Sequence, residues 1–409
     1  MEVIVAVCIG AVVLGIFILL GRSLFPQGRQ RIILLFIDAP DPDNPAAGVA
    51  VWKYILKRRG HLHIVLTGRP VDLSTGKTFK DGVPTRQQVV RQEWERSVQE
   101  HAERLLEDSA ARITNYFLKC NIPSDAFTIY HGGIASSAPM SDVAHDWDFL
   151  FDRKDIITGK TENEGEILDP TDYESLVSKY NELTREEREQ TFLSVLRHFN
   201  LASLETLLSR IERSDDICIF LGGPATAVVE LFGGKSSLCE RVTGFYAMFG
   251  SLNTSGNKKQ TLFMNQFNVA CDLTAASDLF LSDMFPGVEK YLISTETAKQ
   301  TVFVPSAQEL ERYRVNPYVV KLHRLWESTH QNVPQPIFDV LPIMASLPEF
   351  RNCFTWLRKK VVVWDLYKNG NVLQIFCFAE SESSALLVSE NCYNSDKETF
   401  MYFLTGVWE

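Results

Sequence analysis

The sequence predicts an α/β protein with a mostly parallel, open sheet flanked by helices, and three observations carry that prediction. Residues 32–37 and 217–221 are continuous apolar runs of strand length, as expected of strands that are buried on both faces. Between residues 32 and 67 the pattern runs strand, loop, helix, strand, which is the order of a βαβ unit. A chain of 409 residues is long enough to hold one large domain of this class or two smaller ones.

Polar residues follow both of the first two expected strands. The strand at residues 32–37 leads into a Pro-rich loop at 38–45 and a helix at 46–57. The strand at residues 63–67 ends at Gly68-Arg69-Pro70. Functional groups of parallel sheets gather in the loops that follow the carboxyl ends of the strands. We therefore expect a site where these two loops meet.

The middle of the chain alternates between helical and less regular patterns. Residues 86–118 form a long, charged, helix-favouring stretch, and residues 129–152 are looser and contain a cluster of His and Asp. Residues 168–213 are acidic and helical in pattern, which indicates a solvated insertion or an outer helical layer. The strand at 217–221 is closed by Gly222-Gly223-Pro224 and followed by an apolar helix.

The C-terminal residues favour antiparallel pairing. Residues 361–366 and 372–378 are rich in β-favouring side chains and flank Asn369-Gly370, which is a strong hairpin signal. We therefore expect one domain at residues 32–409 with a C-terminal β-rich appendage, a β-hairpin, at residues 358–409.

The N-terminus predicts a membrane anchor. Residues 3–20 are uncharged and apolar, long enough to cross most of a hydrocarbon core of roughly 30 Å. A cleaved signal peptide is the alternative, but the basic residues Arg22, Arg29 and Arg31 follow the apolar run instead of preceding it. We expect a transmembrane helix at residues 1–24, a linker at 25–31, and a single-pass protein whose large domain is cytoplasmic.

Charge and cysteine usage exclude some classes of function. A formal net charge of -10 argues against nucleic acid as a partner, because phosphates need clustered Lys and Arg. The cysteines outside the anchor are scattered, form no CxxC pair and lie mostly in apolar contexts, so we expect buried small hydrophobes and not a metal or redox site.

Four separated motifs occur in order along the chain. The first is the strand and loop LFIDAPDPDN, which contains Asp38, Asp41 and Asn44. The others are FLGGPAT at residues 220–226, MNQFNVACDLTAA at 264–276, and PIFDVLP at 336–342. Together these motifs resemble those of the inosine-uridine-preferring nucleoside hydrolase family.

The resemblance implies a chemistry. A family member cleaves the N-glycosidic bond of a ribonucleoside-like substrate with a water molecule that Ca²⁺ activates and an Asp that takes its proton. By resemblance the catalytic residues are Asp38 and Asp41. The implied metal ligands are Asp38, Asp41, Asp339 and the main-chain carbonyl of Leu221. The implied substrate-binding residues are Asn44, Arg69, Asn257, Gln266 and Asn268.

Several positions depart from the family pattern. The first loop lacks at least one expected carboxylate in any alignment, Gln266 replaces a Glu, and Phe338 stands where the late motif usually has His. Because Ca²⁺ affinity rises with the number of charged ligands, we expect calcium binding to be weakened or lost. The change at Phe338 also removes a candidate leaving-group acid.

Three hypotheses follow. The first is an N-glycosidic hydrolase with a small nucleoside-like substrate, attached to the membrane by its N-terminal helix. The second is a catalytically impaired family member that binds a ribosyl ligand or a protein. The third is an enzyme with an anionic substrate, which Arg69 would suit because it stands where the family has an Asn. The sequence leaves open whether the protein forms a homo-oligomer.

Each site residue also has a purely structural interpretation. The Asp-rich loop could instead be a solvated turn and Asp339 a helix cap, although three carboxylates directly after a buried strand favour a pocket role. His131, Asp142 and His145 could replace the missing acid, although a structural or surface role is the more common outcome for such residues.

Overall fold

The computed structural model describes ten segments of the chain. These are residues 31–39, 43–68, 106–107, 109–135, 201–214, 216–252, 266–329, 332–368, 371–390 and 397–408.

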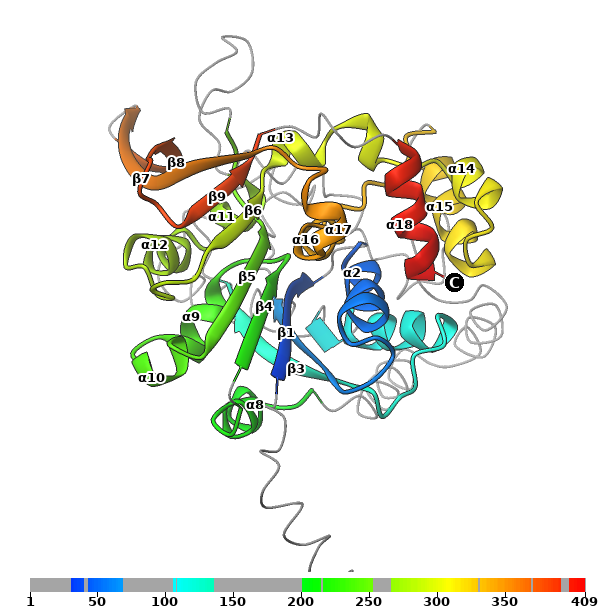
Figure 1. Cartoon of the computed structure of the whole chain (residues 1–409), viewed down its shortest axis with the longest axis horizontal. Coiled ribbons are helices and arrows are strands. Elements are labelled where there is room, and N and C mark those ends of the chain that lie inside the picture. The colour runs from blue at the N-terminus through cyan, green and yellow to red at the C-terminus, as the bar shows by residue number, and fades with distance from the viewer. Residues whose placement is uncertain are drawn as a thin grey trace, which may run out of the picture.

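A nine-stranded sheet forms the centre of the molecule (Figure 1), with the strand order β3-β2-β1-β4-β5-β6-β9-β7-β8. The strands are β1 (Arg31–Ala39), β2 (Leu62–Gly68), β3 (Phe127–Ile134), β4 (Asp216–Leu221), β5 (Val242–Met248), β6 (Lys290–Ile293), β7 (Trp356–Lys368), β8 (Asn371–Glu380) and β9 (Leu386–Ser389). The strands from β3 to β9 in that order pair in parallel, and only the β9–β7 and β7–β8 pairs are antiparallel. The expected mostly parallel sheet is confirmed.

The direction in which successive strands are added to the sheet reverses between β1 and β4. From β1 the chain builds β2 and β3 on one side, and then builds β4, β5 and β6 on the other. In sheets of this kind the crevice at the carboxyl ends of the two central strands is the usual ligand site. The order of the strands therefore points to the end of β1 and the loop after β4.

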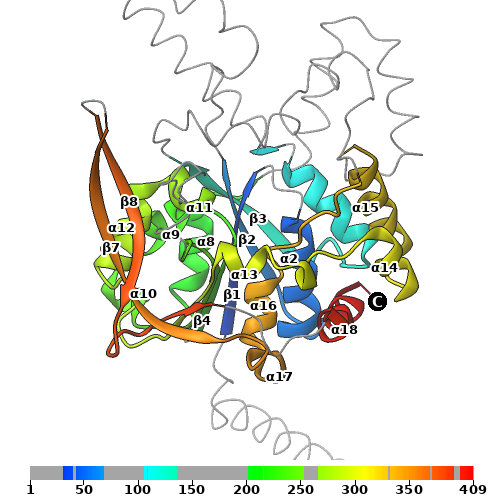
Figure 2. The same cartoon turned by 90° about the horizontal axis from the view of Figure 1, so that it is seen from above.

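Helices cover both faces of the sheet (Figures 1 and 2). Ile33, Leu35 and Ile37 of β1 join one core, and the alternate residues Leu34 and Phe36 join the other. This alternation explains why β1 is a continuous apolar run: with helices on both faces, neither side of the strand meets water.

The two helical layers differ in their members. One contains α2 (Asn44–Ala50), η1 (Val51–Ile55), α14 (Ala307–Arg312), α15 (Pro317–Thr329), α16 (Leu341–Ser346), α17 (Pro348–Arg351) and α18 (Lys397–Trp408). The other contains α8 (Leu204–Ile211), α9 (Thr226–Phe232), α10 (Ser236–Cys239), α11 (Phe267–Cys271) and α12 (Leu273–Leu281). Short helices α13 (Thr295–Ala298) and η3 (Thr301–Phe303) follow β6.

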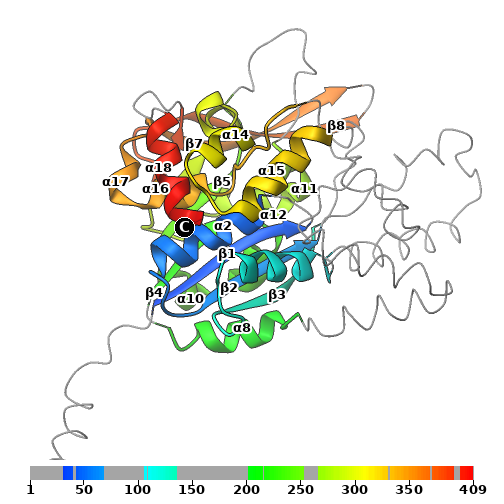
Figure 3. The same ribbon diagram turned by 90° about the vertical axis from the view of Figure 1, so that its right-hand side faces the viewer.

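The C-terminal residues belong to the same sheet and core. The expected hairpin is confirmed, since β7 and β8 pair from Lys359↔Glu380 to Lys368↔Asn371, and β9 joins it to β6. The last helix, α18, returns to the layer of α2 (Figure 3), where the hydroxyl of Tyr54 donates to the carbonyl oxygen of Phe403 at 2.9 Å. This helix was not expected from the sequence.

Residues 127–134 form a strand that the sequence did not predict. They lie largely within the stretch expected to be loose, yet they form β3, which pairs with β2 and also exchanges main-chain hydrogen bonds with Ala202. Gly132 permits this pairing, because a Cβ atom there would lie 2.8 Å from Val65 and 3.0 Å from the carbonyl oxygen of Leu66. Strands β5 and β6 were also not expected.

Three further sequence predictions concern helices, cysteines and the membrane anchor. Residues 109–119 and α8 are helical within the two stretches expected to be so. Five cysteines, Cys120, Cys218, Cys239, Cys271 and Cys353, are free and buried, which confirms the expectation for these five. Within the described segments no helix is long and apolar enough to cross a membrane, and the expected anchor at residues 1–24 lies outside them.

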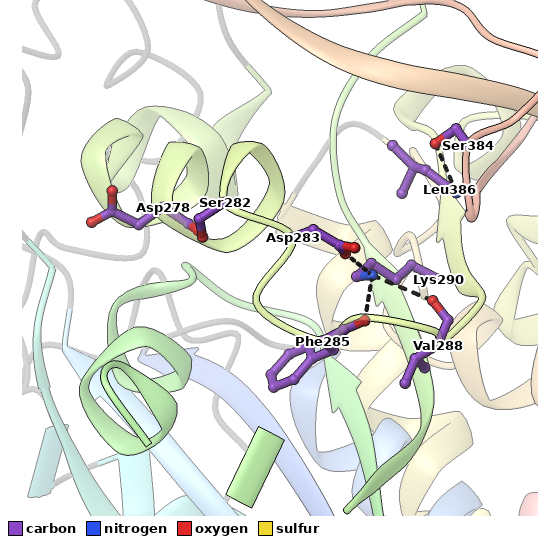
Figure 4. A network of polar contacts seen from close by, with 8 residues as sticks. All are labelled: Asp278, Ser282, Asp283, Phe285, Val288, Lys290, Ser384 and Leu386. Atoms are coloured by element: carbon purple, nitrogen blue, oxygen red, sulfur yellow. Dashed lines mark hydrogen bonds and ion pairs between the residues drawn. The ribbon is translucent and has the colours of Figure 1, made fainter. Parts of the chain in front are cut away.

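A buried lysine fixes the turn that leads from α12 into β6 (Figure 4). Lys290 donates to Asp283 Oδ1 at 2.7 Å, to the carbonyl oxygen of Phe285 at 2.9 Å, and to that of Val288 at 3.3 Å. All three donors of the ammonium group are thus used. Lys290 begins β6, so this contact lies at the amino ends of the strands, away from the carboxyl-end crevice.

Candidate functional site

Two buried aspartates meet the glycine turn at the carboxyl end of β4. Asp38, the penultimate residue of β1, and Asp339, just before α16, are 0% and 4% exposed. A Cβ atom on Gly223 would lie 2.9 Å from the main-chain nitrogen of Asp38, and one on Gly222 would lie 2.6 Å from Asp339 Oδ2. Only glycine at these two positions lets both aspartates approach the turn so closely. The two expected site aspartates therefore adjoin neighbouring residues at the switch point of the sheet.

Asp43 ties the early loop to the late motif. Its Oδ2 accepts a hydrogen bond of 3.0 Å from the main-chain N–H of Asp339, and Asp43 is itself buried. Asp43 also precedes α2 directly, so the same residue lies at the start of that helix and beside Asp339. It was considered only as part of the Asp-rich loop, and the long-range contact that makes it specific could not be deduced from local sequence.

Asn44 begins α2 and faces back toward β1. Its Nδ2 donates to the carbonyl oxygen of Asp38. Its Oδ1 is buried and has no hydrogen-bond partner among the described residues. Asn44 was expected at the site, and the structure places it against Asp38.

Thr67 is a neighbour of Asp38 that the sequence analysis did not single out. The two residues are Cα partners in the β1–β2 pairing, and Thr67 is fully buried. Its Oγ1, like Asn44 Oδ1, meets no hydrogen-bond partner in the described part of the chain. The register between the two strands is needed to find this residue, although a polar side chain near the end of an apolar strand is a partial signal.

Asn268 spans the carboxyl ends of β4 and β5. Its Nδ2 donates to the carbonyl oxygens of Gly222, at 2.8 Å, and Met248, at 3.1 Å. An amide group has two N–H donors, so both are used by the main chain and only Oδ1 remains to contact a ligand. The orientation of the amide follows from the contacts, because an oxygen atom in the same place would face two other oxygens.

Gln266 caps a helix. Its Oε1 accepts from the main-chain N–H of Val269 at 3.3 Å at the start of α11, and from that of Gly250 at 3.4 Å. These contacts hold the segment after β5 against α11. The substrate-binding role expected for Gln266 stays a prediction.

The remaining expected residues divide into two groups. Leu221 ends β4 and is fully buried, so its carbonyl group lies at the same edge as the glycine turn. His131 lies on β3, where its Nδ1 accepts from the main-chain N–H of Gly133 at 3.1 Å. The residues Asp41, Arg69, Asp142, His145 and Asn257 lie outside the described segments.

Calcium fits the described residues in part. Ca²⁺ takes six to eight oxygen ligands, and the carboxylates of Asp38 and Asp339 with the carbonyl of Leu221 are oxygen groups at one edge of the sheet. Among the residues that the structure describes, however, no group of three or more His, Cys, Asp or Glu is placed to hold a metal ion. The described part of the site thus supplies two carboxylates at this edge, and a third charged ligand would have to come from elsewhere.

Comparisons with known proteins agree with this architecture. The model of the family described as inosine-uridine preferring nucleoside hydrolase matches residues 106–385, well over half of the chain. The match begins beyond Asp38 and the altered first loop. No curated protein sequence matches the chain.

Two solved structures share the fold. An inosine-guanosine nucleoside hydrolase superposes with a TM-score of 0.56 at 12% identity, over 92% of this chain and 98% of its own. The effector protein XOO4466 superposes with a TM-score of 0.50 at 12% identity, over 93% of each chain. At such low identity these likenesses show the fold alone.

Proposed function

The chain belongs to the inosine-uridine preferring nucleoside hydrolase family, and from this membership we propose that it hydrolyses the N-glycosidic bond of a ribonucleoside-like compound. The observation that carries the proposal is the approach of Asp38 and Asp339 to the Gly222–Gly223 turn at the switch point of the sheet. Bond cleavage passes through a state in which positive charge develops on the sugar, and carboxylates at this edge would stabilise that charge.

The residues divide the work between the water and the metal ion. Asp38 takes the proton of the attacking water, because it is buried at the end of β1 where that water would lie. The same carboxylate, with Asp339, the carbonyl of Leu221 and, by resemblance, Asp41, would hold Ca²⁺. When bound, the ion lowers the pKa of a water ligand and orients it. The missing carboxylate in the first loop makes us expect weaker binding than a full ligand set would give.

Sugar contacts come from the amide side chains around the turn. Asn268 offers Oδ1 to a sugar hydroxyl while its Nδ2 stays on the main chain. Asn44, Arg69, Asn257 and Gln266 complete the expected set by resemblance to the family.

A second function is favoured by the same contacts. Both N–H donors of Asn268 are used within the protein, and Oε1 of Gln266 accepts two main-chain N–H groups. With fewer free polar groups for the sugar and a reduced set of carboxylates, a family member could retain ribosyl-ligand binding and lose turnover. This alternative predicts binding without hydrolysis.

The N-terminal segment adds a proposed location. An uncharged run at residues 3–20, followed by basic residues, would anchor the domain to a membrane with the site on the cytoplasmic side.

Ribose release separates the two functions. The full-length protein is assayed on inosine, uridine, guanosine and inosine 5′-monophosphate, with added calcium and with chelator. The calcium-dependent hydrolase is supported if ribose release is abolished by the chelator and is lost in the Asp339→Asn variant. Asp278→Asn on the exposed face of α12 is the control and should leave release unchanged. Ligand-induced stabilisation without any release would favour the binding protein instead. The absence of both release and stabilisation would contradict both functions.

A further inference from the structure

We propose that Gln266 determines the substrate class of this site, in that it admits ribosides whose sugar carries a phosphate group. The inference rests on the proposed hydrolase function and goes beyond it by naming the substrate. Three observations carry it: the orientation of the Gln266 amide, the hydrogen-bond donor that this orientation leaves over, and the place of Gln266 on the sheet.

The oxygen of the Gln266 amide fixes the orientation of the whole group. Oε1 accepts hydrogen bonds from two main-chain N–H groups, that of Val269 at 3.3 Å and that of Gly250 at 3.4 Å. The reverse orientation would place the NH2 group against these two donors, and both hydrogen bonds would be lost. The oxygen therefore belongs to the cap of α11, and the nitrogen points away from it.

The nitrogen of the Gln266 amide keeps a donor for a ligand. Its contact within the described segments is with the sulfur of Met248 at 3.8 Å, and a thioether is a weak acceptor. An NH2 group has two N–H donors, so at least one of them has no partner in this part of the chain. Met248 ends β5, and its carbonyl group accepts from the amide of Asn268. The donor of the half-buried Gln266 therefore lies at the carboxyl end of β5.

The order of the strands separates this donor from the site carboxylates. Asp38 lies near the end of β1, Asp339 lies against the turn after β4, and β5 is the next strand along the sheet. Neighbouring strands are about 4.8 Å apart, so the ends of β1 and β5 are separated by roughly 10 Å. Asn268, the expected sugar contact, bridges β4 and β5. A riboside whose anomeric carbon lies beside the carboxylates would thus extend toward β5 with the far side of its sugar.

A neutral amide and a carboxylate act differently on a phosphate group. Gln266 stands where the family pattern has a Glu, and a carboxylate only accepts hydrogen bonds and repels an anion. A carboxylate suits a sugar hydroxyl, which can donate, and disfavours a phosphate, whose oxygens accept and whose charge at pH 7 is about −2. Gln266 carries no charge and donates an N–H group. The substitution therefore removes a repulsion and widens the range of substrates.

Gln266→Glu in the full-length protein tests the inference, with inosine and inosine 5′-monophosphate as substrates and added calcium. The wild type should release reducing sugar from both, with kcat/KM for the monophosphate at least equal to that for inosine. In the variant, kcat/KM for the monophosphate should fall by roughly thirtyfold or more, because two negative charges then meet. The value for inosine should rise, because the hydroxyl then donates to a charged acceptor.

Two features of the test separate specificity from structure. A glutamate at position 266 retains an oxygen that accepts from Val269 and Gly250, so the cap of α11 and the Tm should be preserved. Gln308→Glu is the matched control, because Gln308 is exposed on α14 and the same unit of charge is added there. This control should leave the ratio of the two kcat/KM values at that of the wild type.

The outcomes that overturn the inference are separate from those that overturn the function. A wild type that acts on inosine and not on the monophosphate refutes the phosphate-bearing substrate alone. A ratio of the two kcat/KM values that Gln266→Glu leaves unchanged, with or without a lowered Tm, shows that Gln266 only caps α11. A wild type that releases sugar from neither compound overturns the inference together with the proposed function.

Discussion

The main-chain N–H of Asp339 donates a hydrogen bond to the carboxylate of Asp43 at 3.0 Å, across 296 residues of sequence. Asp43 lies directly before α2, and Asp339 lies two residues before the first residue of α16, so one contact links two helix starts at the carboxyl edge of the sheet. Asp339 also lies against Gly222, so this hydrogen bond links Asp43 to the turn after β4.

Removal of this acceptor should destabilise the protein and the site together. Asp43→Ala leaves the buried N–H of Asp339 without its acceptor, which costs about 1–3 kcal/mol. Asp43→Asn retains an acceptor oxygen and should cost less. Urea unfolding measures both variants, and the increase in Tm on adding calcium chloride reports whether Asp339 has moved. Equal stability of the alanine and asparagine variants would contradict a specific role for the hydrogen bond.

Asn268 is expected to be structural as much as ligand-binding. Asn268→Asp places a carboxylate oxygen opposite the carbonyl oxygens of Gly222 and Met248, and the two lost hydrogen bonds plus this repulsion should cost roughly 3 kcal/mol or more. Chemical denaturation of the ligand-free protein measures the loss. A variant of unchanged stability would show that the amide does not bridge β4 and β5.

Lys290 should matter for stability and not for the site. Lys290→Met keeps the apolar stem but leaves the carbonyl oxygens of Phe285 and Val288 without the ammonium donor, and we expect a loss of about 2–4 kcal/mol. The Asp283 carboxylate is 57% exposed, so its ion pair contributes little of this. The control is Lys235→Met, since the Lys235 contact is exposed and its loss should change stability by less than about 0.5 kcal/mol. Ribose release or calcium binding per folded molecule should stay at the wild-type value in both.

Two buried histidines should make the protein sensitive to acid. Burial lowers the pKa of His63, with smaller contributions from His61 and Arg210, and burial lowers that of His323; both values fall to about 3. A folded pKa below the unfolded value means that the contribution is complete above pH 6.5 and is lost as the pH falls from there toward 3. Each residue should therefore remove about 2 kcal/mol of unfolding free energy between pH 7.5 and 5.

His323→Phe isolates one half of this effect. The ring keeps its edge contact with Trp408, and Nδ1 of His323 has no hydrogen-bond partner among the described residues, so the substitution removes a titrating group without losing a hydrogen bond at Nδ1. Unfolding free energies at pH 7.5 and 5 should differ less in the variant than in the wild type. An identical difference in the two proteins would mean that His323 does not titrate in this range.

The sequence by itself determined the class of the sheet and the composition of its centre. Strands β1, β2 and β4 are visible as apolar runs because both faces of a covered parallel strand are dry, and the β7–β8 hairpin is visible because Asn-Gly is a local turn signal. The motifs around Asp38, Asn268 and Asp339 were found in the same way, since each is a short block of adjacent residues.

The tertiary structure alone decided which residues adjoin Asp38. Strand β3 contains Gly132 and Gly133, which weaken any local strand signal, and it forms because it pairs with β2 and Ala202. The neighbour relation of Thr67 to Asp38 depends on strand register, and that of Asp43 to Asp339 on a contact between distant segments. Local composition fixes which residues are apolar, polar or able to turn. Register and long-range contacts are set by the packing of the whole core, so the partners of Asp38 follow only from the folded chain.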